Sequence, residues 1–169
     1  LATGKPIRSI HVPGATFLNG IAVAKDGAVY VSNTKPLERI YKVTTDGKST
    51  VFAEGGQITL PNGVAMDRKG NIVVVNVGST AVITYSPAGE VVRVEHAAES
   101  GSDGIVILED GTKYVSSVKF GSISKIRPGN KAEVIATGIP SAASMCYDSI
   151  QNQLVIPMNG NYAIAFLKL

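Results

Sequence analysis

The fold of this chain is decided by a short polar turn that recurs three times, as Lys25-Asp26-Gly27, Arg68-Lys69-Gly70 and Glu109-Asp110-Gly111. The glycines that end these turns lie 43 and 41 residues apart. A second series of turns has the same spacing, with glycines at Gly47, Gly89 and Gly129. Two interleaved series of turns with one period indicate an internal repeat of about 42 residues.

A fourth copy of the first turn is degenerate, because Gln151-Asn152 stands where the other copies end in glycine. Asn152 follows Gly111 by 41 residues, so it keeps the period. Asparagine tolerates the left-handed backbone conformation that glycine adopts freely. The sequence therefore predicts that Asn152 closes its turn as the glycines close theirs.

The segments between the turns are short and rich in Val, Ile and Tyr, which favours half-buried strands. The first set of runs is 28–32, 71–75, 112–116 and 153–157, and the second set is 39–43, 81–85, 122–126 and 162–166. No stretch shows a sustained helical period, so we expect essentially no helix. Four antiparallel strands in about 42 residues form one blade of a β-propeller. The sequence thus predicts an all-β propeller.

The repeat divides the single domain, residues 1–169, into blades. We expect blades over 17–60, 61–101 and 102–140, and an incomplete final blade over 141–169. Residues 1–16 are predicted to supply an outer strand, centred on the run from Pro6 to Val12. This strand could complete the fourth blade and close a four-bladed ring. Alternatively, it could end a preceding blade, which would make the chain the C-terminal two-thirds of a six-bladed ring.

Both closures have a consequence for partners. A chain that begins at Leu1 rather than at Met reads as a processed product or a fragment. An open ring exposes unpaired edges, which recruit other chains. We therefore expect self-association, or a missing N-terminal part that closes the ring.

Composition excludes several other classes of protein. The chain has 169 residues, of which 44% are hydrophobic and 17% charged, so it is not disordered. No apolar run approaches the roughly 20 residues that a membrane span requires. The net charge is only +3 and the bases are scattered, so nucleic-acid binding is not expected. The low charge density favours a secreted or periplasmic location over a cytoplasmic one.

The chain has one cysteine, Cys146, which rules out an internal disulfide and a zinc site built from cysteines. Its neighbours in 143–147 are mostly apolar, and this predicts a buried, inert thiol.

The segments that open the blades carry a family resemblance. They read Leu18-Asn19-Gly20-Ile21-Ala22-Val23, Leu60-Pro61-Asn62-Gly63-Val64-Ala65-Met66-Asp67 and Ser102-Asp103-Gly104-Ile105-Val106. This pattern resembles the gluconolactonase and senescence-marker-protein (regucalcin) family of six-bladed propellers, and it is similar to NHL-repeat and strictosidine-synthase-like propellers. The resemblance favours the six-bladed closure. It implies a lactone or ester hydrolase that acts on a small molecule and depends on a divalent metal.

In that family the metal lies in the central channel and is held by side chains of the innermost strands. Asn19, Asn62 and Asp103 match the pattern, because each precedes a glycine and lies eight residues before the turn glycine of its blade. The resemblance implies that these three residues bind the metal and that Asp103 is also the general base. The family's Glu ligand of the first blade has no counterpart here.

Oxygen ligands of this kind suit Ca²⁺, and also Mn²⁺, Mg²⁺ or Zn²⁺. The metal would polarise a carbonyl and activate water, and no organic cofactor is expected. Asn-Gly and Asp-Gly are also ordinary turn dipeptides, so a purely structural role for the three residues stays open.

Further candidates for substrate binding, or for support of the metal ligands, lie at equivalent positions of the repeat. Ser144 takes the position of Asp103 in the fourth blade. A second ring follows each turn glycine by six residues, and it comprises Asn33, Asn76 and Ser117. Lys119 and Phe120 lie in the next turn, where they could overhang the channel. Polar caps at strand ends are the alternative role for the second ring. A non-catalytic NHL-like module that binds a protein or small ligand is the alternative function.

Overall fold

A computed structural model describes residues 4–169 and contains fifteen strands and no helix within that range. The all-β prediction is therefore confirmed, and the described residues offer no helix that could cross a bilayer. The first eight strands are β1 (Leu18–Val23), β2 (Val29–Asn33), β3 (Arg39–Val43), β4 (Ser49–Glu54), β5 (Pro61–Met66), β6 (Ile72–Asn76), β7 (Ala81–Tyr85) and β8 (Val91–His96). The other seven are β9 (Ser102–Ile107), β10 (Lys113–Ser117), β11 (Ser122–Ile126), β12 (Glu133–Ala136), β13 (Cys146–Asp148), β14 (Gln153–Met158) and β15 (Ala163–Lys168).

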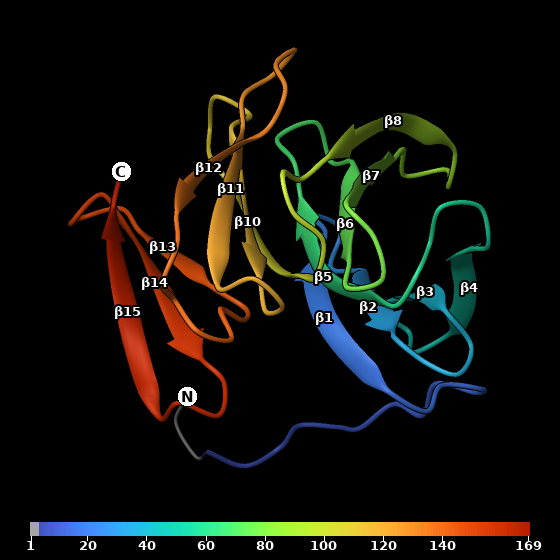
Figure 1. The fold of residues 1–169 in the computed structure, drawn as a ribbon. Helices are drawn as coiled ribbons and strands as arrows, with labels where there is room; N and C mark the ends of the chain where they lie inside the picture. The colour runs from blue at the N-terminus through green and yellow to red at the C-terminus, as the bar shows by residue number, and fades with distance from the viewer. Residues whose placement is uncertain (1–3) are drawn as a thin grey trace.

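The strands form four antiparallel sheets, each made of consecutive strands, which are the predicted propeller blades. β1–β4, β5–β8 and β9–β12 make four-stranded blades, and β13–β15 make a three-stranded one. The blades follow one another in an arc (Figure 1), and the innermost strands β1, β5 and β9 contact each other in turn. Side chains on the inner strands of neighbouring blades are thereby brought together.

The turns of the repeat adopt the predicted backbone conformation. Gly27, Gly70 and Gly111 have φ of 85°, 82° and 85°, and Asn152 has φ of 49° at the fourth copy. The prediction for Asn152 is therefore confirmed.

The core consists of layers between the blades, and the second blade buries both faces of its middle strands. In β6, Ile72 and Val74 pack with residues of the first blade, whereas Val73 and Val75 pack with residues of the third. All four side chains are fully buried. This explains why β6 is a continuous aliphatic run rather than an alternating one.

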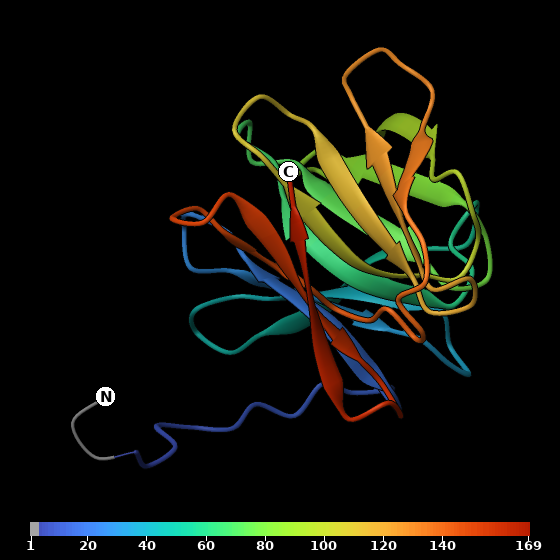
Figure 2. The same cartoon turned by 60° about the vertical axis from the view of Figure 1, so that its left-hand side comes forward.

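The outer strand expected over residues 1–16 has no counterpart among the described residues of that range. Residues 4–17 contain no strand, and residues 1–3 of that range lie outside the described residues. Instead, Ile10 and Val12 pack against Val31 and Tyr41 of the first blade. Figure 2 shows the start of the described chain extending away from the sheets before it reaches the first blade. A strand needs a neighbouring edge, and here apolar contacts to the face of the first blade take the place of pairing.

The two ends of the arc expose apolar side chains. Ile21 and Val23 of β1 are 62% exposed, and Ile164 and Phe166 of β15 are 60% and 65% exposed. No backbone hydrogen bond within residues 4–169 joins the first blade to the last. These faces resemble the interior faces of the other blades, so they are surfaces on which a further blade would pack.

The expectation of a buried cysteine was wrong, because Cys146 is exposed. Its apolar neighbours Ala142 and Ala143 are buried. Cys146 lies on β13, in the last blade, where Ile164 and Phe166 are also exposed.

Candidate functional site

Each of the first three inner strands contains a β-bulge at the residue pair that the repeat singles out. In β1, Leu18 pairs with Asn33 and Ile21 with Val31, so Asn19 and Gly20 together oppose Ser32 alone. The same register shift occurs at Asn62-Gly63 in β5 and at Asp103-Gly104 in β9. A bulge changes the direction of the side chain that it contains. The side chains of Asn19, Asn62 and Asp103 therefore depart from the regular alternation of their strands.

The glycines of these pairs allow the inner strands to approach closely. A Cβ at Gly20 would lie 2.1 Å from the backbone oxygen of Asn62, and one at Gly63 would lie 2.5 Å from the backbone oxygen of Asp103. A Cβ at Gly104 would lie 2.8 Å from Cα of Ser144. None of these glycines has a left-handed φ. The Asn-Gly and Asp-Gly pairs therefore lie within strands, where glycine lets a neighbouring backbone come close. They are not turn dipeptides here.

We call the predicted site residues at equivalent positions of successive blades the axial row: Asn19, Asn62, Asp103 and Ser144. Hydrogen bonds connect the last three. Asn62 Nδ2 donates to Asp103 Oδ2 at 3.0 Å, and Ser144 Oγ donates to Asp103 Oδ1 at 3.3 Å. Asp103 thus lies between its neighbours from the second and fourth blades, with both carboxylate oxygens hydrogen-bonded.

The environment of Asp103 changes its acidity. Burial raises the pKa of the Asp103 carboxyl above its ordinary value, and the hydrogen bonds from Ser144 and Asn62 oppose part of this rise. A carboxylate with a raised pKa is a stronger base than an exposed one once it has lost its proton.

Asn62 has an amide oxygen without a partner. The residue is 5% exposed, and its Oδ1 is buried with no hydrogen bond, although its Nδ2 is bonded to Asp103. An unsatisfied buried acceptor is costly, and a cation is one ligand that would satisfy it. Asn19, by contrast, is exposed, and its Nδ2 donates to Thr34 Oγ1 at 3.4 Å.

The donors of the axial row are one carboxylate, amide oxygens and a hydroxyl, which are hard oxygen ligands that suit Ca²⁺, Mg²⁺ or Mn²⁺. Within residues 4–169 no group of three or more His, Cys, Asp or Glu side chains is arranged to hold a metal ion. A metal at this site would therefore depend on the amide oxygens as well as on Asp103.

The side chains of the second predicted ring hydrogen-bond to backbone groups that lie just before the inner strands of their blades. Asn33 Oδ1 accepts from the N–H groups of Thr16 and Phe17, and Asn76 Oδ1 accepts from that of Thr59. Both asparagines are fully buried. Ser117 Oγ donates to the Ser100 carbonyl at 2.7 Å. These side chains hold the segments that lead into the inner strands, which is the capping role left open by the sequence.

Lys119 and Phe120 lie at the same end of the third blade as Asp103, because Ser102 at the start of β9 pairs with Ser117 at the end of β10. Phe120 is half exposed, and Lys119 Nζ lies 5.1 Å from the centre of its ring. Both residues remain candidates for substrate contact at the mouth of the site.

The sequence reasoning missed two serines that connect neighbouring blades. Ser32 Oγ accepts from the Gly20 N–H at 2.9 Å and donates to the Asn62 carbonyl at 2.6 Å. Ser116 Oγ makes the equivalent bonds to the Gly104 N–H and the Ala143 carbonyl. The sequence did contain a signal for them, because each serine directly precedes a member of the predicted second ring.

These features define a β-propeller whose blades meet at a row of polar side chains on the inner strands. The family model of the SMP-30/gluconolactonase/LRE-like region matches residues 4–100, which is more than half of the chain. The chain belongs to this family. No curated protein matches the sequence.

Solved structures show the same fold at low sequence identity. A chain of a nidogen/laminin complex has a TM-score of 0.81 and 19% identity, over 94% of this chain and 63% of that one. A gluconolactonase from Xanthomonas campestris has a TM-score of 0.76 and 16% identity, with coverage of 90% and 58%. Virginiamycin B lyase from Staphylococcus aureus has a TM-score of 0.70 and 14% identity, with coverage of 95% and 58%. This chain thus spans less than two-thirds of the length of each of these three proteins.

Proposed function

We propose that this protein hydrolyses a lactone or ester and that a divalent metal bound at the axial row takes part in the reaction. The observation that carries the proposal is the pair formed by Asn62 and Asp103. A half-buried carboxylate with a raised pKa lies beside a buried amide whose oxygen is unpartnered. Membership of the SMP-30/gluconolactonase/LRE-like family supports lactones as the substrate class.

In this proposal Asp103, Asn62 and Asn19 hold the metal through their side-chain oxygens. The metal would supply Lewis-acid polarisation of the substrate carbonyl and a bound water of lowered pKa. Asp103 accepts the proton of the attacking water. Asn62 Nδ2 and Ser144 Oγ orient the carboxylate. Lys119 and Phe120 contact the substrate from the turn above.

The experiment is a calorimetric titration of Ca²⁺, Mn²⁺ and Zn²⁺ into metal-free protein, followed by a hydrolysis assay with a sugar lactone and an aryl ester. The Asp103→Ala variant should lose saturable metal binding and hydrolysis together. Asp110→Ala, which alters a turn aspartate bonded to Thr112 in the same blade, is the matched control and should retain both. A folded wild-type chain that neither binds a metal nor hydrolyses either substrate would contradict the proposal.

A non-catalytic binding module is the second candidate, and one observation favours it. The structural neighbour with a TM-score of 0.81 is a chain of a nidogen/laminin complex, which is an assembly of proteins. A propeller of this type would bind its ligand on one face and would not need the axial carboxylate. Asp103→Ala would then leave ligand binding unchanged.

The exposed faces at the ends of the arc bear on both candidates. We propose that a second copy of the chain or further propeller blades cover Ile21 and Val23 at one end and Ile164 and Phe166 at the other. The support is the exposure of these apolar side chains and the partial coverage of the structural relatives. Light scattering of the purified chain measures the self-association.

A further inference from the structure

The second and third blades meet differently from the first and second. At the first interface Tyr30, Phe52 and Tyr85 pack edge to face, with ring centroids 4.8 and 5.8 Å apart. At the second interface the buried cluster is aliphatic. Val73 takes the place of Tyr30 as the second residue of its strand, and Ile126 takes the place of Tyr85 as the last. Smaller side chains thus occupy positions that aromatic rings fill one interface away.

The second interface also contains a charged pair at positions that are apolar elsewhere in the repeat. Lys113 is the first residue of β10, where the equivalent strands begin with Val29 and Ile72. Glu95 pairs with Val82 across the outer strands, where the other blades have Ala53 and Ala136. Lys113 Nζ lies 2.8 Å from Glu95 Oε2, and the side chains are only 7% and 12% exposed.

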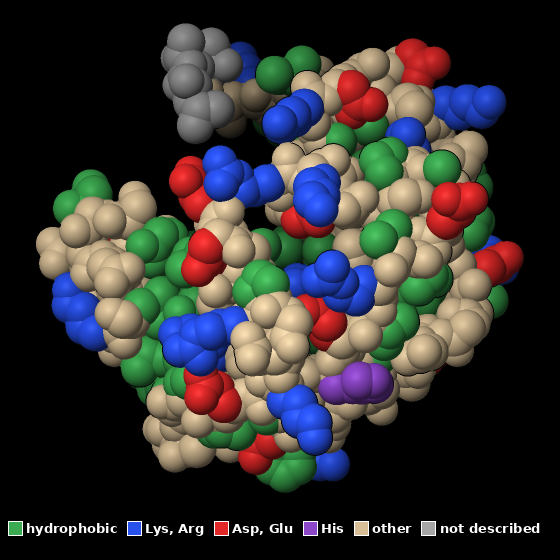
Figure 3. Space-filling model, turned by 90° about the horizontal axis from the view of Figure 1, so that it is seen from above, with side chains coloured by type: hydrophobic (Ala, Val, Ile, Leu, Met, Phe, Trp, Pro, Cys, Tyr) green, Lys and Arg blue, Asp and Glu red, His purple; other side chains and the backbone are tan. Residues whose placement is uncertain are grey.

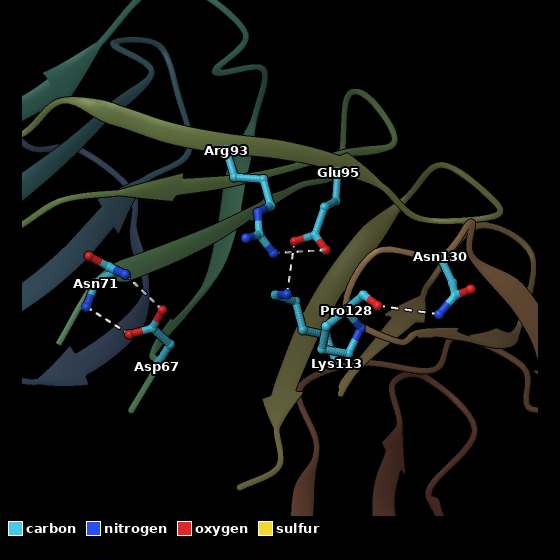
Figure 4. Close-up of polar contacts among 7 residues, drawn as sticks. All are labelled: Asp67, Asn71, Arg93, Glu95, Lys113, Pro128 and Asn130. Atoms are coloured by element: carbon cyan, nitrogen blue, oxygen red, sulfur yellow. Dashed lines mark hydrogen bonds and ion pairs between the residues drawn. The ribbon is translucent and has the colours of Figure 1, made fainter. Parts of the chain in front are cut away.

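A groove of about 730 Å³ opens at this interface, between β8 and the turn that joins β11 to β12. Residues 93–98 and 128–132 line this groove, which we call the outer groove. Figure 4 shows Arg93, Glu95 and Lys113 pointing toward one another from the two blades, with Pro128 and Asn130 beside them. Ala97, Ala98 and Ala132 contribute small apolar surfaces.

The charges around the outer groove favour an anion. Two cations, Arg93 and Lys131, line it together with one carboxylate, Glu95, and Lys113 neutralises Glu95 from the third blade. This excess is local, because the face seen from above in Figure 3 mixes Lys and Arg with Asp and Glu. Arg93 is half exposed, and its nearest ion-pair contact to Glu95 is long, at 3.9 Å. Its guanidinium is therefore available for a bidentate contact with a carboxylate.

We propose that the outer groove binds a small aromatic carboxylate, with its ring against the alanines and its carboxylate on Arg93. Ala97, Ala98 and Ala132 give the ring an apolar wall. The groove lies on the outer strand of the second blade, whereas Asp103 lies on an inner strand. The site is thus separate from the axial row and independent of the proposed hydrolase activity.

Titration of 2-naphthoate and benzoate into isotope-labelled protein, followed by NMR of the backbone amides, tests the proposal. Saturable shifts are expected for residues of the outer groove, with the neutral amides of both acids binding about tenfold more weakly. Arg93→Gln should weaken naphthoate binding about tenfold, and Ala98→Trp should abolish it by filling the groove.

Both altered side chains are exposed, so both variants should fold, and circular dichroism checks this. Arg39→Gln is the matched control, because Arg39 pairs with Glu54 across the outer strands of the first blade and should not affect binding. The proposal is overturned if neither acid causes saturable shifts in the outer groove, or if Arg93→Gln and Ala98→Trp bind naphthoate as the wild type does.

Discussion

Asn62 and Asp103 are 41 residues apart in the sequence, and yet Nδ2 of the first donates to Oδ2 of the second at 3.0 Å. Each residue lies in the bulge of an inner strand and precedes a glycine without which the strands could not approach so closely. The hydrogen bond is therefore a product of the repeat, since one period of the chain equals one step around the propeller.

Replacement of Asp103 by Asn should stabilise the protein at neutral pH. Because the pKa of Asp103 is raised in the folded state, the folded chain binds the proton more tightly than the unfolded chain, and stability falls as pH rises through the raised value. Thermal melts should show a higher Tm for Asp103→Asn at pH 7, with the difference shrinking toward about pH 4.

Asp110→Asn provides a control of opposite sign. Hydrogen bonds from Thr112 lower the pKa of Asp110, so its contribution to stability is present at neutral pH and lost in acid. This variant should melt below the wild type at pH 7. A wild-type protein that is as stable as Asp103→Asn at every pH would show that burial does not raise the pKa of Asp103.

Gly63→Ala should disrupt the approach of β5 to β9. Its Cβ would lie 2.5 Å from the Asp103 backbone oxygen and 2.9 Å from Val75 Cγ2, so the expected loss is about 3 kcal/mol of unfolding free energy. Gly55→Ala is the comparison, because Gly55 has φ of 71° and open space around it, and should cost only about 1 kcal/mol. Urea unfolding measures both, and equal losses would count against the close-approach argument.

Ser32→Ala should remove a connection between the first two blades. The variant leaves the Gly20 N–H and the Asn62 carbonyl without their side-chain partner, which should cost about 2 kcal/mol. Ser86→Ala removes an exposed hydrogen bond within a single turn and should cost less than about 0.5 kcal/mol. If chemical denaturation gives the same stability for both variants, the contact between blades is not important.

The Lys113–Glu95 pair should behave as a buried ion pair. Glu95→Ala leaves the buried ammonium without its counterion and should cost about 3–5 kcal/mol. The double variant Lys113→Ile with Glu95→Ala installs the apolar residue types of the equivalent positions, and should return to within about 1 kcal/mol of the wild type. A double variant no more stable than Glu95→Ala would contradict this account.

The fold could be predicted because turns and strands are local. The positive φ of Asn152 and the absence of helix in residues 4–169 follow from residue types and their spacing. The predicted outer strand between Pro6 and Val12 failed for the opposite reason. An edge strand forms only against a neighbouring edge, and no local pattern indicates whether that edge is available.

The candidate site could be predicted only in part. The repeat identified Asn19, Asn62, Asp103 and Ser144 as equivalent positions, but Asn19 is exposed whereas Asn62 is buried with an unpartnered oxygen. Burial depends on which neighbours pack around a residue. The period contains no such information, and it likewise did not reveal that Cys146 is exposed.

By itself, the sequence determined the period of the repeat, the strands and turns of each blade, and the residues that occupy equivalent positions, since these depend on short-range conformational preferences. Only the tertiary structure decided which of those residues meet. It brings Asp103 between Asn62 and Ser144, buries Asn33 and Asn76 against backbone, and pairs Lys113 with Glu95 across two blades. The physical reason is that such contacts form between inner or outer strands about one repeat apart, and their chemistry depends on packing between the blades.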